Sequence, residues 1–322
     1  MDAHLYTRRI LIFLAFVIGA SWVTALLINQ SSLMKTDSLS AMALANYIII
    51  LTPALANIFT RLVTKEGWGH TLLRLNFRRG WRFYLAAWLL PLLAVIAGGS
   101  IFYLLYPQSF DPSAGGFLKM VQGTPFAATA SPYLGLLTFT LYLLLVGLTI
   151  NALASFGEEF GWRAYLLPKL VGRFSGAPGE STGPASGLNP AAARKAALLV
   201  GVIWSVWHYP LFFLGASAGS PFPNLLGYLV FTTSLSVLLS WVTLRSGSVW
   251  PACIGHGVIN ATSVLPGAML LGPAIPLVGP DTTGLIGGLG YIILALALLF
   301  TRRAFTVGQE PGSEGLRAVV VP

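Results

Sequence analysis

Charged residues are scarce in this sequence. Of its 322 residues, 19 are Lys or Arg and 10 are Asp or Glu, so only 9% are charged, whereas a soluble domain carries about 25%. Hydrophobic residues make up 55% of the chain, and a soluble fold of this size could not cover its surface with so few polar groups. The composition therefore excludes a soluble globular enzyme and a disordered tail.

Cysteine and cofactor motifs are equally sparse. Cys253 is the only cysteine, which excludes an internal disulfide. The chain has no H-E-x-x-H zinc motif, no P-loop and no G-x-G-x-x-G sequence, so the motifs indicate neither a bound nucleotide nor a resident metal. We read Cys253 as a small apolar helix residue.

Long apolar runs dominate what remains. We identify eight hydrophobic segments, and most exceed the roughly 18 residues that a helix needs to cross a membrane. They lie near 10–28, 42–60, 83–106, 133–156, 196–214, 225–244, 249–265 and 284–301. The sequence therefore predicts an all-α polytopic membrane bundle of about eight transmembrane helices. We expect one domain over 1–305, with its site region at 130–265, and a flexible cytoplasmic tail over 306–322.

The positions of the cations predict the orientation of this bundle. If all eight segments span and the N-terminus is cytoplasmic, 17 of the 19 cations fall on the cytoplasmic side, as the positive-inside rule requires. Only Lys35 and Lys119 fall outside. Both termini are therefore predicted to be cytoplasmic in a multi-pass protein of the cell membrane. The net charge of +9 then reflects membrane orientation and does not indicate a nucleic-acid partner.

Acidic and imidazole side chains are almost confined to the loops. We expect eight of the ten acids to lie in water, namely Asp2, Asp37, Glu66, Asp111, Glu180, Asp281, Glu310 and Glu314. The helical core keeps Glu158 and Glu159, at the cytoplasmic end of the fourth segment, together with His208 and His256. An ionisable group at membrane depth costs roughly 2.5–3.5 kcal/mol, so such groups are functional candidates by default.

Three of these four residues belong to pairs that are spaced four positions apart in the sequence. They are Glu159 with Arg163, Trp204 with His208, and His256 with Asn260. Residues four apart share one helix face, so Arg163 can hold Glu159 ionised. Glu158, rotated by about 100°, can face another helix. Each pair alone has a structural explanation as an end-of-helix ion pair, a packing contact or an interhelical hydrogen bond. Together, on three different helices, the pairs can converge on one cavity.

The three motifs resemble those of the CPBP intramembrane proteases, the family that includes the type II CAAX prenyl endopeptidase. The family pattern is E-E-x-x-x-R, then F-x-x-x-H, then H-x-x-x-N/D on separate helices. The chain matches it at 158–163, 204–208 and 256–260, except that Trp204 replaces the usual Phe. The resemblance covers roughly residues 130–265 and implies an intramembrane endopeptidase.

The resemblance also implies roles for the residues. Glu158 and His208 would activate a water molecule as general base, while Glu159 and Arg163 would hold the site. His256 and Asn260 would stabilise the oxyanion. Trp204 would form part of the substrate-binding wall. The family is described as glutamic-type, so we expect no metal and no other cofactor. The partners would be membrane lipid and a peptide or protein substrate, lipidated or unlipidated.

Three alternatives remain at this stage. Two His and two Glu side chains could bind zinc, which would make the protein a zinc-dependent hydrolase. A non-enzymatic scaffold or immunity-type binding protein would also carry the same helices. A transporter could use the intramembrane charges for proton coupling, although the sequence has no internal repeat.

Overall fold

Each of the eight predicted apolar segments overlaps a helix of the bundle. The computed structural model describes residues 3–31, 38–175, 189–213 and 221–306. The α-helices of this part are α1 (Ala3–Gln30), α3 (Ser38–Val63), α4 (Phe77–Leu105), α5 (Gly115–Met120), α6 (Pro132–Val146), α7 (Ala152–Gly161), α8 (Leu167–Ser175), α9 (Pro190–Leu211), α10 (Pro221–Ser246), α11 (Trp250–Thr262) and α12 (Leu289–Phe300). The expected tail over 306–322, apart from Thr306, lies outside the described residues, as do residues 176–188 between α8 and α9.

The predicted all-α membrane bundle is confirmed. Over the described ranges the chain forms no strand, only isolated bridges such as the one between Phe110 and Leu270. Five helices of this part are long and apolar enough to cross a membrane, and α12 is a shorter apolar helix. α11, at 13 residues, corresponds to the seventh hydrophobic segment, near 249–265, and carries His256 and Asn260. It is shielded because α4, α7 and α10 pack around it.

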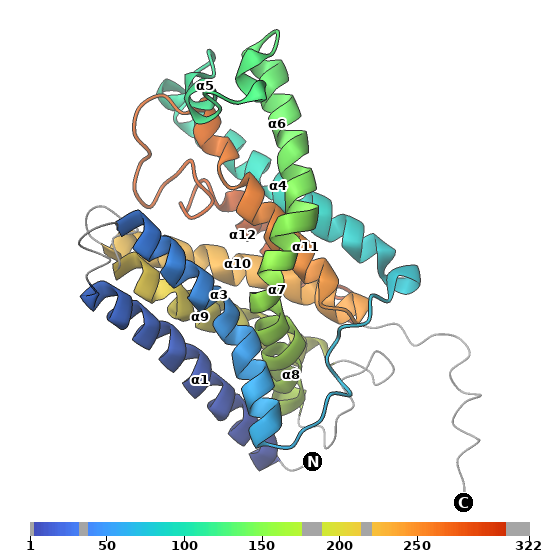
Figure 1. The fold of residues 1–322 in the computed structure, drawn as a ribbon. Helices are drawn as coiled ribbons and strands as arrows, with labels where there is room; N and C mark the ends of the chain where they lie inside the picture. The colour runs from blue at the N-terminus through green and yellow to red at the C-terminus, as the bar shows by residue number, and fades with distance from the viewer. Residues whose placement is uncertain (1–2, 32–37, 176–188, 214–220, 307–322) are drawn as a thin grey trace, which may run out of the picture.

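One prediction about a helix boundary was wrong. The fourth segment does not end at 156 but continues without a break from Pro132 to Ser175, through α6, α7 and α8 (green in Figure 1). At 1.5 Å per residue these 44 residues extend about 66 Å, twice the thickness of the hydrocarbon core. The hydropathy falls after 156 because of Glu158, Glu159 and Arg163. These side chains are buried among other helices, so the helix continues past them.

Two π-helical turns interrupt the α geometry of this long helix. They are η3 (Gly147–Asn151) and η4 (Trp162–Leu166), and they bracket α7 on both sides. π turns inside α-helices occur frequently at functional sites, because they rotate the side chains that follow them. Here the two turns enclose the ten residues that carry Glu158 and Glu159.

The sequence encodes the starts of two of these helices directly. Ser131 caps α6, since its Oγ accepts a hydrogen bond from the Leu134 amide at 3.2 Å, and Pro132 follows at the first helical position. Asn189 caps α9 in the same way, with Oδ1 accepting from the Ala191 and Ala192 amides. Such caps satisfy amides that have no partner within the helix.

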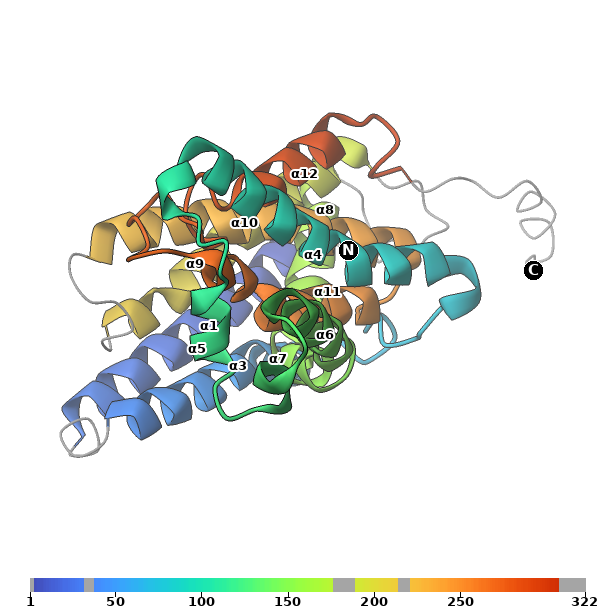
Figure 2. The same cartoon turned by 90° about the horizontal axis from the view of Figure 1, so that it is seen from above.

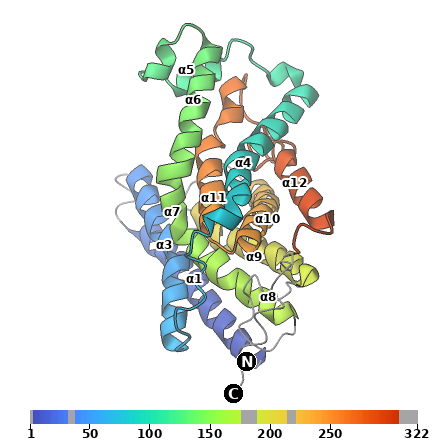
Figure 3. The same ribbon diagram turned by 90° about the vertical axis from the view of Figure 1, so that its right-hand side faces the viewer.

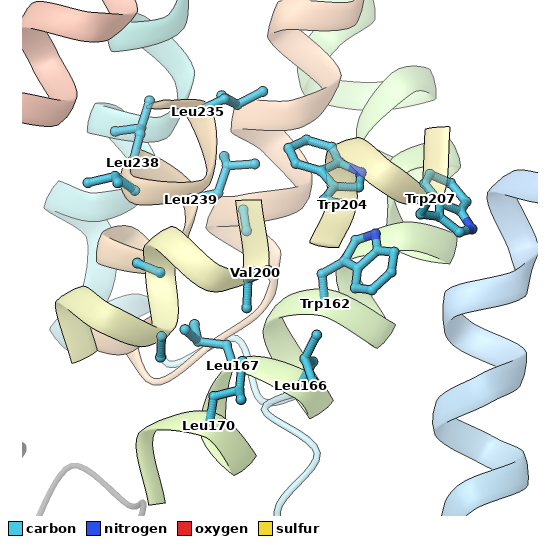
Figure 4. Packing of buried hydrophobic residues seen from close by; sticks show 14 of the residues in the cluster. Trp162, Leu166, Leu167, Leu170, Val200, Trp204, Trp207, Leu235, Leu238 and Leu239 are labelled. Carbon is cyan, nitrogen blue, oxygen red and sulfur yellow. The ribbon is translucent and has the colours of Figure 1, made fainter. Parts of the chain in front are cut away.

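The helices surround α7 and α11 near the centre of the bundle. α1 and α3 lie side by side along one flank, and α9 and α10 pack against each other behind them (Figures 1 and 2). α11 lies beside α6 and α4, with α12 further along the same side (Figure 3). A cluster of apolar side chains from η4, α8, α9 and α10 packs between these elements, including Trp162, Leu167, Val200 and Leu239 (Figure 4).

Two glycines let neighbouring helices approach α7 closely. A Cβ at Gly161 would lie 2.4 Å from Cβ of Pro53, inside α3. A Cβ at Gly257 would lie 2.4 Å from the carbonyl oxygen of Gly147 and 2.5 Å from the amide nitrogen of Ala152. Small residues at such crossings allow close packing of membrane helices. They hold α3 and α11 against the segment that carries the two glutamates.

Candidate functional site

Three helices bring the candidate residues together. Glu158 and Glu159 come from α7 and Arg163 from η4, while Trp204 and His208 come from α9 and His256 from α11. Glu159 and Arg163 are fully buried, and Glu158, Trp204 and His256 are at most 4% exposed. His208 is slightly more open, with 13% of its side chain exposed. The predicted convergence of the three motifs therefore holds for these six residues.

Glu159 organises one half of the cluster. Arg163 Nη1 donates a hydrogen bond to Glu159 Oε1 at 2.9 Å, as the spacing of four residues indicated. His256 Nδ1 lies 2.8 Å from the same oxygen. Both contacts are charge-assisted, and such hydrogen bonds are stronger than neutral ones. The Arg163 guanidinium also lies over the Trp204 ring, 4.5 Å from its centre. The Glu159–Arg163 ion pair thus holds His256 through Glu159 and packs on the Trp204 ring through Arg163.

Glu158 faces away from this ion pair toward α9 and α11. Trp204 Nε1 donates a hydrogen bond to Glu158 Oε2 at 2.7 Å. His208 Nε2 lies 3.9 Å from the same oxygen, and His256 Nε2 lies 3.9 Å from Glu158 Oε1. Two imidazoles therefore flank one carboxylate at the same distance, each just beyond direct hydrogen bonding.

The neighbours of the two histidines determine which ring nitrogens face Glu158. His208 Nδ1 lies 3.0 Å from the Trp204 carbonyl oxygen. A carbonyl oxygen only accepts, so we assign the proton of His208 to Nδ1. The Glu159 carboxylate accepts from His256 Nδ1 by the same argument. Each Nε2 is therefore left facing Glu158, free to accept a proton or, when the ring is doubly protonated, to donate one.

Three aromatic rings pack against His208. Trp207 meets it edge to face with ring centres 4.4 Å apart, Tyr228 of α10 does so at 5.0 Å, and Trp204 lies tilted at 5.7 Å. Trp207 is itself anchored, because its Nε1 donates to Thr52 Oγ1 of α3 at 3.0 Å. Tyr228 was not among the sequence candidates, since a tyrosine inside an apolar run carries no distinguishing pattern.

Asn260 does not join the buried cluster. It lies one turn beyond His256 on α11, but its side chain is exposed. Its side-chain amide makes no hydrogen bond within the described part of the chain. Its predicted part in binding an oxyanion therefore depends on a bound substrate and stays a prediction.

The described residues contain no group of three His, Cys, Asp or Glu side chains spaced to hold a metal ion. Glu158 Oε2 already accepts the Trp204 hydrogen bond at 2.7 Å, and Glu159 is engaged by Arg163 and His256. Glu158 Oε2 and Glu159 Oε1 are thus engaged in hydrogen bonds with other side chains, whereas among the described residues the Nε2 atoms of His208 and His256 are not.

A second charged cluster corrects the prediction that Glu66 lies in water. Glu66 follows α3 in a loop, as expected, but only 3% of its side chain is exposed. It forms ion pairs with Lys169, with Arg9 at 3.3 Å and with Arg61 at 3.8 Å. Because these cations belong to α1, α3 and α8, the cluster joins three helices. A hydropathy profile cannot show this, since the partners lie more than 50 residues away in two cases.

Known proteins resemble the region that holds the site. Residues 138–262 match the family described as type II CAAX prenyl endopeptidase Rce1-like. This range begins in α6, ends in α11 and contains every candidate residue. CAAX prenyl protease 2 of Methanococcus maripaludis is 25% identical over 171 residues, which are 51% of this chain and 51% of the relative. The chain thus spans about half the length of this curated relative.

Proposed function

We propose that this chain, whose residues 138–262 match the type II CAAX prenyl endopeptidase Rce1-like family, is an intramembrane endopeptidase of the glutamic type. The observation that carries the proposal is the pair of imidazole Nε2 atoms, each 3.9 Å from an oxygen of the buried Glu158 carboxylate. A buried acceptor flanked by two titratable rings is suited to take a proton from water and pass it on.

The nucleophile is a water molecule activated by Glu158 and His208. One water bridges the 3.9 Å between Glu158 Oε2 and His208 Nε2 with a hydrogen bond of about 2.8 Å to each. Both atoms accept, so the water donates both protons and directs a lone pair at the scissile carbonyl. Glu158 takes the proton as the carbon–oxygen bond forms and delivers it to the leaving amine, with no covalent intermediate.

His256 supplies positive charge on the other side of Glu158. Its Nδ1 contacts Glu159 and its Nε2 faces Glu158, so two carboxylates favour the imidazolium form of the ring. The Nε2–H of that form donates to the developing oxyanion, and the exposed Asn260 amide, one turn further on, contributes a second donor once substrate is bound. Glu159 and Arg163 hold His256 in place.

The substrate is a peptide or protein, lipidated or unlipidated, that reaches the site from the cytoplasmic leaflet. The orientation follows from the cations, 17 of which fall on one side of the predicted topology. Both termini then lie in the cytoplasm, and the protein resides in the cell membrane in contact with its lipids.

A cleavage assay tests the proposal. The purified protein in proteoliposomes is given a panel of C-terminal peptides, with and without a prenyl group. We expect Glu158→Gln to abolish cleavage while the thermal unfolding midpoint stays near that of wild type, and chelators to leave the wild type active. Loss of activity on chelation, restored by zinc, would support a zinc hydrolase instead. A folded wild type that cleaves none of the peptides would favour a scaffold protein.

A further inference from the structure

Trp204 makes a contact that a substrate-wall residue would not make. Its Nε1 donates to Glu158 Oε2 at 2.7 Å, and the residue is only 2% exposed. Its ring contacts the Arg163 guanidinium, which lies 4.5 Å from the ring centre, and meets the His256 ring edge to face at 5.1 Å. The indole is therefore enclosed by the charged site and offers little surface to a substrate.

This hydrogen bond restricts the Glu158 carboxylate. A carboxylate rotates freely about its last torsion unless a donor holds one oxygen. An indole has a single donor on a rigid ring, and this ring cannot swing because Arg163 and His256 pack against it. Glu158 Oε2 is thereby held at 3.9 Å from His208 Nε2. The same helix turn carries a second constraint, since the Trp204 carbonyl accepts from His208 Nδ1 at 3.0 Å.

We propose that Trp204 is a positioning residue that holds both members of the water-activating pair, Glu158 through its indole N–H and His208 through its main-chain carbonyl. This inference rests on the proposed function, in which Glu158 and His208 act on one water. Phenylalanine at this position would keep the ring contacts but lose the donor. The indole donor is therefore the part of the side chain that a substitution must remove.

Steady-state cleavage by Trp204→Phe tests the role in catalysis. We expect kcat to fall about 10- to 100-fold, because small misplacements of reacting groups carry losses of this size, while KM stays within about threefold. A rise in KM at constant kcat would mean that Trp204 binds substrate and would overturn the proposal. A Trp204→Phe variant with wild-type kcat would overturn it as well.

Two further variants separate positioning from folding. Replacing Trp204 by benzothienylalanine, in which sulfur takes the place of the N–H, keeps the size and shape of the ring and should lower kcat as much as Trp204→Phe. Trp162→Phe is the matched control. Trp162 is equally buried, but its Nε1 has no hydrogen-bond partner within the described part of the chain, so kcat should stay within about threefold of wild type.

A spectroscopic measurement tests the contact without any activity. The indole N–H signal of Trp204 is assigned in ¹⁵N spectra as the one that disappears in the Trp204→Phe variant. Glu158→Gln replaces a charged acceptor by a neutral one, so we expect it to shift this signal more than those of the other eight tryptophans. A signal that does not move would overturn the inference. If the wild type cleaves no peptide, the proposed function fails, yet this measurement still decides whether Trp204 holds Glu158.

Discussion

Replacing Gly257 by alanine should move His256 away from Glu159 in the buried charged cluster. The new Cβ would lie 2.4 Å from the Gly147 carbonyl oxygen and 2.5 Å from the Ala152 amide nitrogen, whereas ordinary contact begins near 3.4 Å. Both neighbours are main-chain atoms of the long helix, so α11 must move away by about 1 Å. His256 precedes Gly257 and lies 2.8 Å from Glu159. The shift would lengthen this hydrogen bond by up to about 1 Å, which takes it beyond hydrogen-bond distance when the displacement lies along the bond.

We expect this displacement to lower kcat about 100-fold and the free energy of unfolding by about 1–3 kcal/mol. Peptide cleavage in proteoliposomes and thermal unfolding in detergent measure the two effects. Gly19→Ala is the control, because a Cβ at this exposed position of α1 meets no atom within 4 Å and should leave both quantities nearly unchanged. Wild-type kcat and stability in Gly257→Ala would refute the argument that this close approach sets the position of His256.

Three further predictions concern charged residues. Glu66→Gln should lower the free energy of unfolding by about 3–5 kcal/mol, because it leaves buried cations without their carboxylate; an unchanged thermal midpoint would contradict this. Glu159→Gln should lower kcat at least about tenfold, since His256 and Arg163 lose their shared acceptor, and a wild-type kcat would count against that role. Asp111 lies in the loop after α4, where hydrogen bonds from the Ser113 hydroxyl, the Ser113 amide and the Gly115 amide hold its pKa below the ordinary 3.8. The carboxylate therefore stabilises this loop above pH 3.8, and the contribution is lost as the pH falls through the lowered pKa. Carboxyl NMR should give a midpoint below 3.8, and a higher midpoint would contradict the prediction.

The scarcity of charge made the buried cluster of charged and imidazole side chains easy to predict. Glu158, Glu159, His208 and His256 stand out because the surrounding helices carry almost no other titratable groups. Their spacing on three helices was enough to predict that they meet, and helical periodicity was enough to predict that Arg163 reaches Glu159 and that Glu158 faces elsewhere. The reason is physical, since a buried charge must find a partner and few partners exist.

Other features depend on tertiary packing and could not be predicted. Glu66 looked like a loop acid in water, but it meets cations supplied by distant helices. The fourth helix continues to Ser175 because its charged turn is buried, although hydropathy ends the segment at 156. The Trp204–Glu158 hydrogen bond depends on the rotation of α9 relative to α7, and motif spacing within one helix does not fix that rotation.

The most direct test of the account is a single turnover in H₂¹⁸O. Purified protein in excess over a cleavable peptide should place one ¹⁸O atom in the new carboxylate of the product and none in the Glu158 side chain, because Glu158 activates the water and forms no bond to the substrate. Mass spectrometry of the product and of the peptide containing Glu158 reads both positions. Label in Glu158 after one turnover, or cleavage by a folded Glu158→Gln variant, would contradict the central claim.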